Sequence, residues 1–251
     1  MSKSKKHTKK DRLNGKSSIL GISFSIILLG FAVFAGFYME KNTYIQSVKI
    51  EGNYYVDESE LLEVFDSPVG LRADSVQFDS IFKQIKEVPY VKNVSVSMSI
   101  RGSLTFIIEE RQPLAILVNG SSQSYISEGG VLLSIIPEKV LNVPLTYGIS
   151  AISATDSTFT NEYSQIESFL LAARENDVAW ATLSEIAWTK NEGVIALTHE
   201  NGVKLIFGEN NFTNKLHDWK AFYSDVVTQK GIHAFDIIDL RFRDQIVTRN
   251  L

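Results

Sequence analysis

The sequence contains no cysteine, and only four of its 251 residues are histidine. A chain without cysteine cannot form disulfides, thiolate metal sites or cysteine nucleophiles, although this absence is compatible with both oxidising and reducing compartments. The histidines never fall at the i, i+4 spacing of a helical metal site; they are His7, His199, His217 and His233. The net charge of −4 gives no indication of nucleic-acid binding.

Signatures of catalysis are also lacking. The chain has no Gly-x-Ser-x-Gly elbow, P-loop or dinucleotide fingerprint. Glu109 and Glu110 are adjacent in an expected strand, so they face opposite sides and cannot form a carboxylate pair. His217 and Asp218, on an expected helix, are more typical of a solvated surface than of a catalytic couple. We therefore predict a protein that is not an enzyme and has no cofactor, metal or small-molecule substrate.

Charge and hydropathy are distributed unevenly at the N-terminus. Seven lysines and arginines lie between positions 3 and 16, and no charged residue occurs from Ile19 to Tyr38. As a helix, 19–38 would be about 30 Å long, which matches the hydrocarbon core of a bilayer. We expect a cytoplasmic basic tail at 1–18, a transmembrane helix at 19–38 in contact with the lipid bilayer, and a linker at 39–44. A signal peptide cleaved near Val33–Ala35 is the alternative, but the long apolar run favours a retained anchor.

The segment 45–113 predicts a small β-α-α-β-β domain. Alternating residues from Ile45 to Glu51 indicate a strand that ends at the Gly52–Asn53 turn. Two amphipathic helices follow, and the second carries Phe78, Ile81, Phe82 and Ile85 on one side. Two further strands enclose an Arg-Gly-Ser turn, and we expect the helices to cover one face of the sheet.

The segment 114–251 predicts a second, mostly antiparallel β domain with two helices. Strands are expected at 114–118, on both sides of Glu128-Gly129-Gly130, and at 183–208. The helices are expected at about 161–176 and 212–230, where apolar residues recur at helical spacing. Two short strands joined at Asp244 end the chain. The fold class is therefore α+β, with a transmembrane helix before two domains.

Several motifs carry a family resemblance. "VKIEGN" at 48–53, "VPYVKNVSV" at 88–96 and "EERQPLA" at 109–115 resemble a POTRA domain. A basic-tailed single-pass anchor before one POTRA domain is similar to the FtsQ/DivIB family of bacterial cell-division proteins. "FDIIDLRF" at 235–242 resembles the signature near the end of FtsQ-type β domains. The resemblance implies that the terminal strands recruit an FtsB-like partner, with an FtsL-like protein attached, by strand addition.

A strand at the extreme C-terminus is either a protected edge or a surface for a partner. The resemblance favours the partner surface, whereas the residues alone favour charges that only solvate the edge. Main-chain hydrogen bonds would supply affinity, and the arginines would favour an acidic partner. The predicted partner-binding residues are Arg241, Phe242, Arg243, Gln245, Ile246, Val247, Thr248 and Arg249.

Two classes of function follow. The first is a division scaffold in the bacterial cytoplasmic membrane, with its N-terminus in the cytoplasm, its bulk in the periplasm and enrichment at the septum. The second is an envelope chaperone or secretion component that holds extended clients with its POTRA domain. Loss of a division protein would give filaments, whereas loss of a chaperone would change the levels of outer-membrane proteins.

Overall fold

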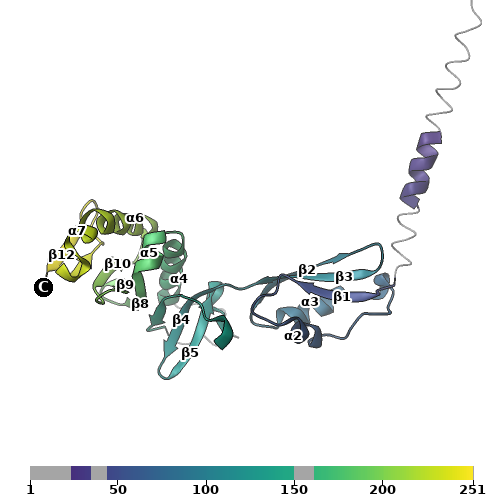
Figure 1. Ribbon diagram of the computed structural model, residues 1–251, viewed down its shortest axis with the longest axis horizontal. Helices are drawn as coiled ribbons and strands as arrows, with labels where there is room; N and C mark the ends of the chain where they lie inside the picture. The colour runs from purple at the N-terminus through teal and green to yellow at the C-terminus, as the bar shows by residue number, and fades with distance from the viewer. Residues whose placement is uncertain (1–23, 35–43, 150–160, 251) are drawn as a thin grey trace, which may run out of the picture. The chain divides into compact units, whose positions relative to one another are not determined.

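The computed structural model describes residues 24–34, 44–149 and 161–250. The first range is helical and lies inside the span expected at 19–38, whose two ends fall outside the described residues. None of the described helices combines the length and the hydropathy needed to cross a bilayer. The described chain divides into two compact units, and residues 54–57, 86–93 and 109–250 form the larger one (Figure 1).

The smaller sheet has the order β1-β3-β2, with β3 in the centre and parallel to β1. Two helices and a 3-10 turn separate β1 from β2, so the expected order β-α-α-β-β is confirmed. The element bounds are β1 Ser47–Glu51, α2 Glu58–Glu63, a 3-10 turn Ala73–Ser75, α3 Phe78–Lys86, β2 Val91–Met98 and β3 Ser103–Glu110.

Aromatic side chains form the core of the smaller unit. Phe106 of β3 is fully buried, and its ring meets those of Phe65 and Phe82 edge to face, with centroids 5.3 and 6.3 Å apart. The glycine of the VKIEGN motif, Gly52, has a φ of 85°. A Cβ at this position would lie 2.3 Å from the carbonyl oxygen of Ile108. Only glycine allows this close approach of two backbones.

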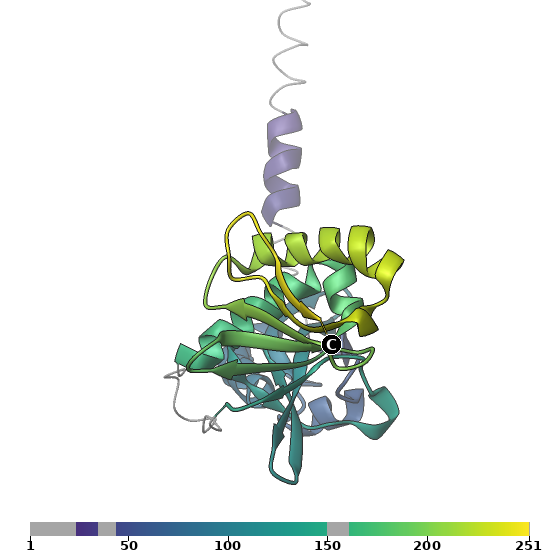
Figure 2. The same ribbon diagram turned by 90° about the vertical axis from the view of Figure 1, so that its left-hand side faces the viewer.

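The larger unit is built on a nine-stranded sheet with the order β12-β11-β10-β9-β8-β7-β4-β5-β6. Helices lie along one side of this sheet, with α6 uppermost in Figure 2. The strands are β4 Pro113–Asn119, β5 Ser122–Ser127, β6 Leu132–Leu133, β7 Leu145–Tyr147, β8 Leu183–Thr189, β9 Gly193–Thr198, β10 Lys204–Gly208, β11 Phe235–Asp239 and β12 Val247–Asn250. The helices are α4 Asn161–Arg174, α5 Asp177–Thr182, α6 Phe212–Phe222, a π segment Tyr223–Val227 and α7 Thr228–Lys230; 3-10 turns lie at Glu128–Gly130, Pro137–Lys139 and Ile232–Ala234.

The nine-stranded sheet is mixed, and most of its strand pairs are antiparallel, as the sequence predicted. β7 is parallel to both of its neighbours, β4 and β8, and β10 is parallel to β11. Parallel neighbours need a long crossover, usually through a helix. α6 supplies that crossover between β10 and β11, while α4 and α5 lie between β7 and β8. The short helix α5, capped by the Asn176 side chain, was not expected.

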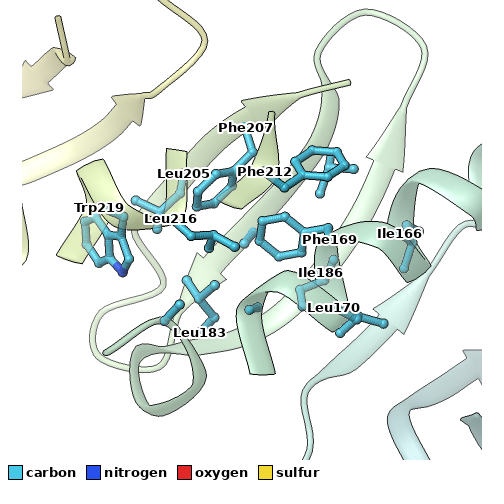
Figure 3. Packing of buried hydrophobic residues seen from close by; sticks show 14 of the residues in the cluster. Ile166, Phe169, Leu170, Leu183, Ile186, Leu205, Phe207, Phe212, Leu216 and Trp219 are labelled. Atoms are coloured by element: carbon cyan, nitrogen blue, oxygen red, sulfur yellow. The ribbon is translucent and has the colours of Figure 1, made fainter. Parts of the chain in front are cut away.

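The core of the larger unit lies between the helices and the sheet (Figure 3). Phe169 of α4 packs between Phe207 of β10 and Phe212 of α6, with ring centroids 4.7 and 5.5 Å away. Trp219 of α6 is fully buried, and its indole N–H donates to the Thr182 hydroxyl at 3.0 Å. Four residues at helical spacing along α4 are buried; they are Tyr163, Ile166, Leu170 and Ala173.

Candidate partner-binding edge

β12 forms one edge of the nine-stranded sheet, and among the described residues it pairs only with β11, in antiparallel orientation. Asp244 reverses the chain before β12 with a φ of 61°, a conformation that aspartate tolerates better than most residues. All four residues of β12 are exposed. An edge of this kind presents unpaired N–H and C=O groups along its outer side.

The eight predicted residues lie along one continuous stretch, from the end of β11 into β12. Arg241, Phe242 and Arg243 line a polar groove of about 490 Å³. Gln245 and Ile246 line a second groove of about 510 Å³, which α6 and the π segment complete. The remaining three form the edge strand; they are Val247, Thr248 and Arg249.

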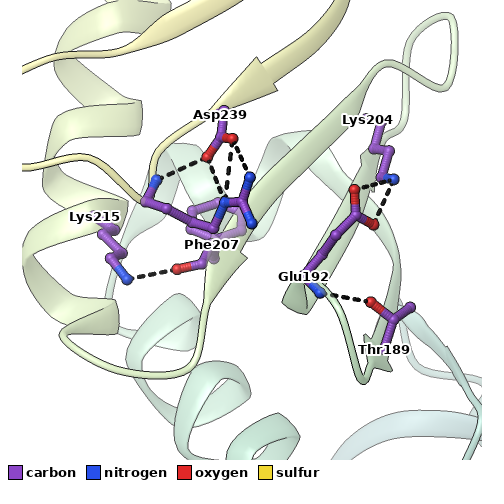
Figure 4. A network of polar contacts seen from close by, with 7 residues as sticks. Thr189, Glu192, Lys204, Phe207, Lys215 and Asp239 are labelled. Carbon is purple, nitrogen blue, oxygen red and sulfur yellow. Dashed lines mark hydrogen bonds and ion pairs between the residues drawn. The ribbon is translucent and has the colours of Figure 1, made fainter.

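Arg241 is held by an ion pair with Asp239, whose contacts are drawn as dashed lines in Figure 4. Its Nε donates to Asp239 Oδ1 at 2.9 Å and its Nη2 donates to Oδ2 at 2.6 Å. The backbone N–H of Arg241 also donates to Asp239 Oδ1, at 3.0 Å. The Asp-Leu-Arg motif therefore ties the end of β11 to the loop that follows, and Arg241 is not a free cation on the surface.

The other two arginines of the predicted site differ in how closely they are ion-paired within the chain. Arg249 Nη2 donates to Asp236 Oδ2 at 2.6 Å, across the β11–β12 pair. Arg243 is 95% exposed, and its only ion pair among the described residues is a loose one, 3.7 Å from Nε to Asp244 Oδ2. Because the ion pair of Arg243 is the longest and most exposed of the three, Arg243 is the arginine most available to an incoming carboxylate.

Lys215 of α6 is a member of the polar groove that sequence reasoning missed. Its Nζ donates to the Phe207 carbonyl at 2.6 Å (Figure 4). Burial lowers the pKa of Lys215, nearby Asp239 opposes that shift, and Arg241 adds to it. A negative group entering the groove would therefore be favoured by this partly desolvated cation, whose hydrogen bond is made to a neutral carbonyl. No local signal identifies Lys215, because α6 reaches the β11 end only in the folded unit.

The pKa of Asp239 should make the free energy of unfolding of the larger unit depend on pH. Burial acts to raise the pKa of Asp239, but hydrogen bonds from Arg241 outweigh it and hold the pKa below the usual value of 3.8. A carboxyl whose pKa is lower in the folded state stabilises the fold above its unfolded pKa, and this contribution is lost as the pH falls through the folded pKa.

We therefore expect Asp239→Asn to flatten the acid limb of the stability curve. Between pH 6 and pH 3 the variant should lose less unfolding free energy than the parent chain, while being less stable at pH 7. Urea titrations at several pH values, followed by tryptophan fluorescence, would measure both curves. Parallel curves over the whole range would show that Asp239 carries no such linkage.

Comparison with known proteins identifies the family of the segment that contains this edge. The family described as "FtsQ/DivIB, C-terminal related" matches residues 112–249, which include the nine-stranded sheet from β4 to β12 except for Asn250, the last residue of β12. The chain belongs to the FtsQ/DivIB family. Members are division proteins without enzymatic activity, so the prediction that this chain is not an enzyme is confirmed.

Individual relatives of this FtsQ/DivIB-family chain cover both units. The cell division protein FtsQ of Koribacter versatilis is 23% identical over 94% of this chain and 72% of the relative. FtsQ of Geotalea daltonii is 27% identical, over 68% of this chain and 63% of that protein. A solved structure of the major extracytoplasmic domain of DivIB from Geobacillus stearothermophilus is 19% identical, covers 48% of this chain and 97% of that chain, and has a TM-score of 0.33.

Proposed function

We propose that this protein is a membrane-anchored scaffold of the bacterial division complex that captures a partner by strand addition at β12. The observation that carries the proposal is the exposure of the whole of β12 at the edge of the larger sheet, directly beside two grooves. A partner strand laid along β12 would satisfy its outward backbone groups. Because relatives in this family are cell division proteins, we assign this partner capture to cell division.

The anchor and topology belong to the same proposal. The uncharged run 19–38 follows a basic tail, so we place the N-terminus in the cytoplasm and the two folded units outside it. The partners would be other anchored division proteins of the FtsB and FtsL type. Confinement of all components to one membrane raises their effective concentration, so each contact can be weak.

The grooves suggest the chemistry of the captured segment. Lys215 and Arg243 offer positive charge on one side of the 242–246 connection, whereas Asp225 and Ile246 offer an acidic and apolar surface on the other. We infer a partner strand that carries a carboxylate toward Lys215 and an apolar or basic residue toward Ile246. Two of the three predicted arginines are already paired, so a uniformly acidic partner fits less well.

Proline substitution in β12 tests strand addition directly. Along an edge strand, alternate N–H groups point outward, so either Val247→Pro or Thr248→Pro removes an outward donor. Each lost hydrogen bond contributes about 1 kcal/mol and the proline ring also blocks the approach, so the affinity for a partner should fall by about tenfold or more. The probe is the purified FtsB-type protein of the same cell, and the readout is the dissociation constant.

Thr248→Ala is the matched control, because it keeps the backbone N–H and removes only exposed side-chain atoms. Its affinity should stay within about twofold of the parent value. If both proline variants also bound like the parent, capture would not use the β12 backbone. A fluorescent N-terminal fusion in dividing cells then tests the setting, since a division scaffold accumulates at midcell and an envelope chaperone does not.

A further inference from the structure

Four large apolar side chains are exposed at one end of the smaller unit. Ile100, in the turn between β2 and β3, is 83% exposed, and Tyr44, Val69 and Leu71 are each about half exposed. Single exposed apolar residues are ordinary, but a group of them marks a surface for a partner or a membrane. We call these four residues the apolar tip.

Backbone hydrogen bonds join the three segments that carry the apolar tip. Ile45 N–H donates to the Leu71 carbonyl at 2.9 Å, and Gly70 N–H donates back to the Ile45 carbonyl at 2.8 Å. Gln46 N–H donates to the Gly102 carbonyl at 2.8 Å, which brings the β2–β3 turn to the same end (Figure 1). The tip is therefore built from segments far apart in sequence and held together by main-chain bonds.

The side chains of the tip are much more exposed than the core residues of this unit. Leu61 of α2, Ile85 of α3 and Phe106 of β3 are fully buried, whereas about half or more of each tip side chain is exposed. Arg101 is exposed beside Ile100, and Arg72 adjoins Leu71, where it pairs with Asp74 at 2.8 Å. Aromatic, aliphatic and arginine side chains together are the composition of surfaces that sit at a membrane interface.

The short connection to the anchor helix keeps the apolar tip within reach of the bilayer. The described part of the uncharged helix ends at residue 34, and the first residue of the apolar tip is Tyr44. The connection between them spans at most about 35 Å even when fully extended. We propose that the apolar tip inserts into the lipid headgroup region beside the chain's own anchor, which holds the smaller unit in one orientation on the membrane. This inference rests on the anchor of the proposed function.

Single cysteines test the contact, because the chain has none of its own. Full-length Ile100→Cys would be labelled with an environment-sensitive fluorophore and placed in bilayer nanodiscs made with either plain or brominated phosphatidylglycerol–phosphatidylcholine. We expect brominated lipid to quench the label at position 100 and the emission to shift to the blue. Adding Leu71→Asp should reduce this quenching, since a carboxylate opposes insertion.

Two further labels distinguish membrane contact by the apolar tip from membrane insertion of the anchor helix. Ile107→Cys is the matched control in the same unit, because Ile107 is an exposed apolar residue in the middle of β3, about 13 Å along the strand from Ser103. It should show no quenching. Leu28→Cys lies in the apolar helix and reports the anchor. Quenching at 28 but not at 100 overturns the tip contact and leaves the anchor intact, whereas no quenching at 28 overturns the anchor itself.

Discussion

Replacing Glu110 with alanine should lower the free energy of unfolding of the larger unit by about 2–5 kcal/mol, because three backbone N–H groups would lose their acceptor. Glu110 is only 8% exposed. Its carboxylate accepts from Tyr54 N–H at 2.8 Å, from Tyr55 N–H at 2.8 and 3.0 Å, and from Val56 N–H at 3.0 Å. Buried donors left without partners are costly, and water cannot easily replace a carboxylate there.

The adjacent Glu109 provides the control. Glu109 is 58% exposed and has a loose pair with Lys92 at 3.5 Å. Glu109→Ala should change stability by about 0–1 kcal/mol. Urea unfolding of both variants can be followed by tryptophan fluorescence, since Trp180, Trp188 and Trp219 all lie in the larger unit. Equal midpoints for the two variants would show that the Glu110 carboxylate does not stabilise the 54–56 segment.

Gly193→Ala should destabilise the same unit by about 3–5 kcal/mol, since it combines backbone strain with a steric clash. Gly193 opens β9 with a φ of 70° and pairs with Gly208 at an irregular point of the β9–β10 ladder. A Cβ at Gly193 would lie 2.4 Å from the carbonyl carbon of Gly208 and 2.5 Å from its oxygen. These are backbone atoms of a central strand, so they cannot move aside as a flexible side chain would.

Gly202→Ala distinguishes the effect of backbone strain from that of a steric clash. Gly202 has a φ of 59°, but a Cβ there would meet nothing within 4 Å. This variant should therefore show only the cost of the left-handed backbone, about 1–2 kcal/mol. The same urea titration compares the two glycines. If Gly193→Ala were no more destabilising than Gly202→Ala, the close approach of β9 and β10 would be relaxed in solution.

Local patterns in the sequence were enough for most elements of both units. The alternation of β1 and of β8 to β10, and the helical spacing of α3, α4 and α6, were predicted close to their observed bounds. These patterns are reliable because each strand or helix must bury one face, and that requirement repeats along the chain. The same reasoning found the last strand, which is observed as β12 Val247–Asn250.

The sequence could not show which elements become neighbours. β7 has three residues, too few for a periodic signal, yet it lies between β4 and β8 in the middle of the larger sheet. Its position follows from the helical crossover that leads from β7 to β8.

Polar contacts in the larger unit, at the candidate site and elsewhere, also depend on residues that are distant in the sequence. Lys215 reaches the groove from α6, and Glu110 binds backbone groups more than fifty positions earlier in the chain. By itself, the sequence determined the anchor-like run, the two folded segments and the terminal edge. Only the tertiary structure decided that Asp239 holds Arg241 and that Lys215 joins the groove, because burial and charge at a site depend on side chains brought together by folding.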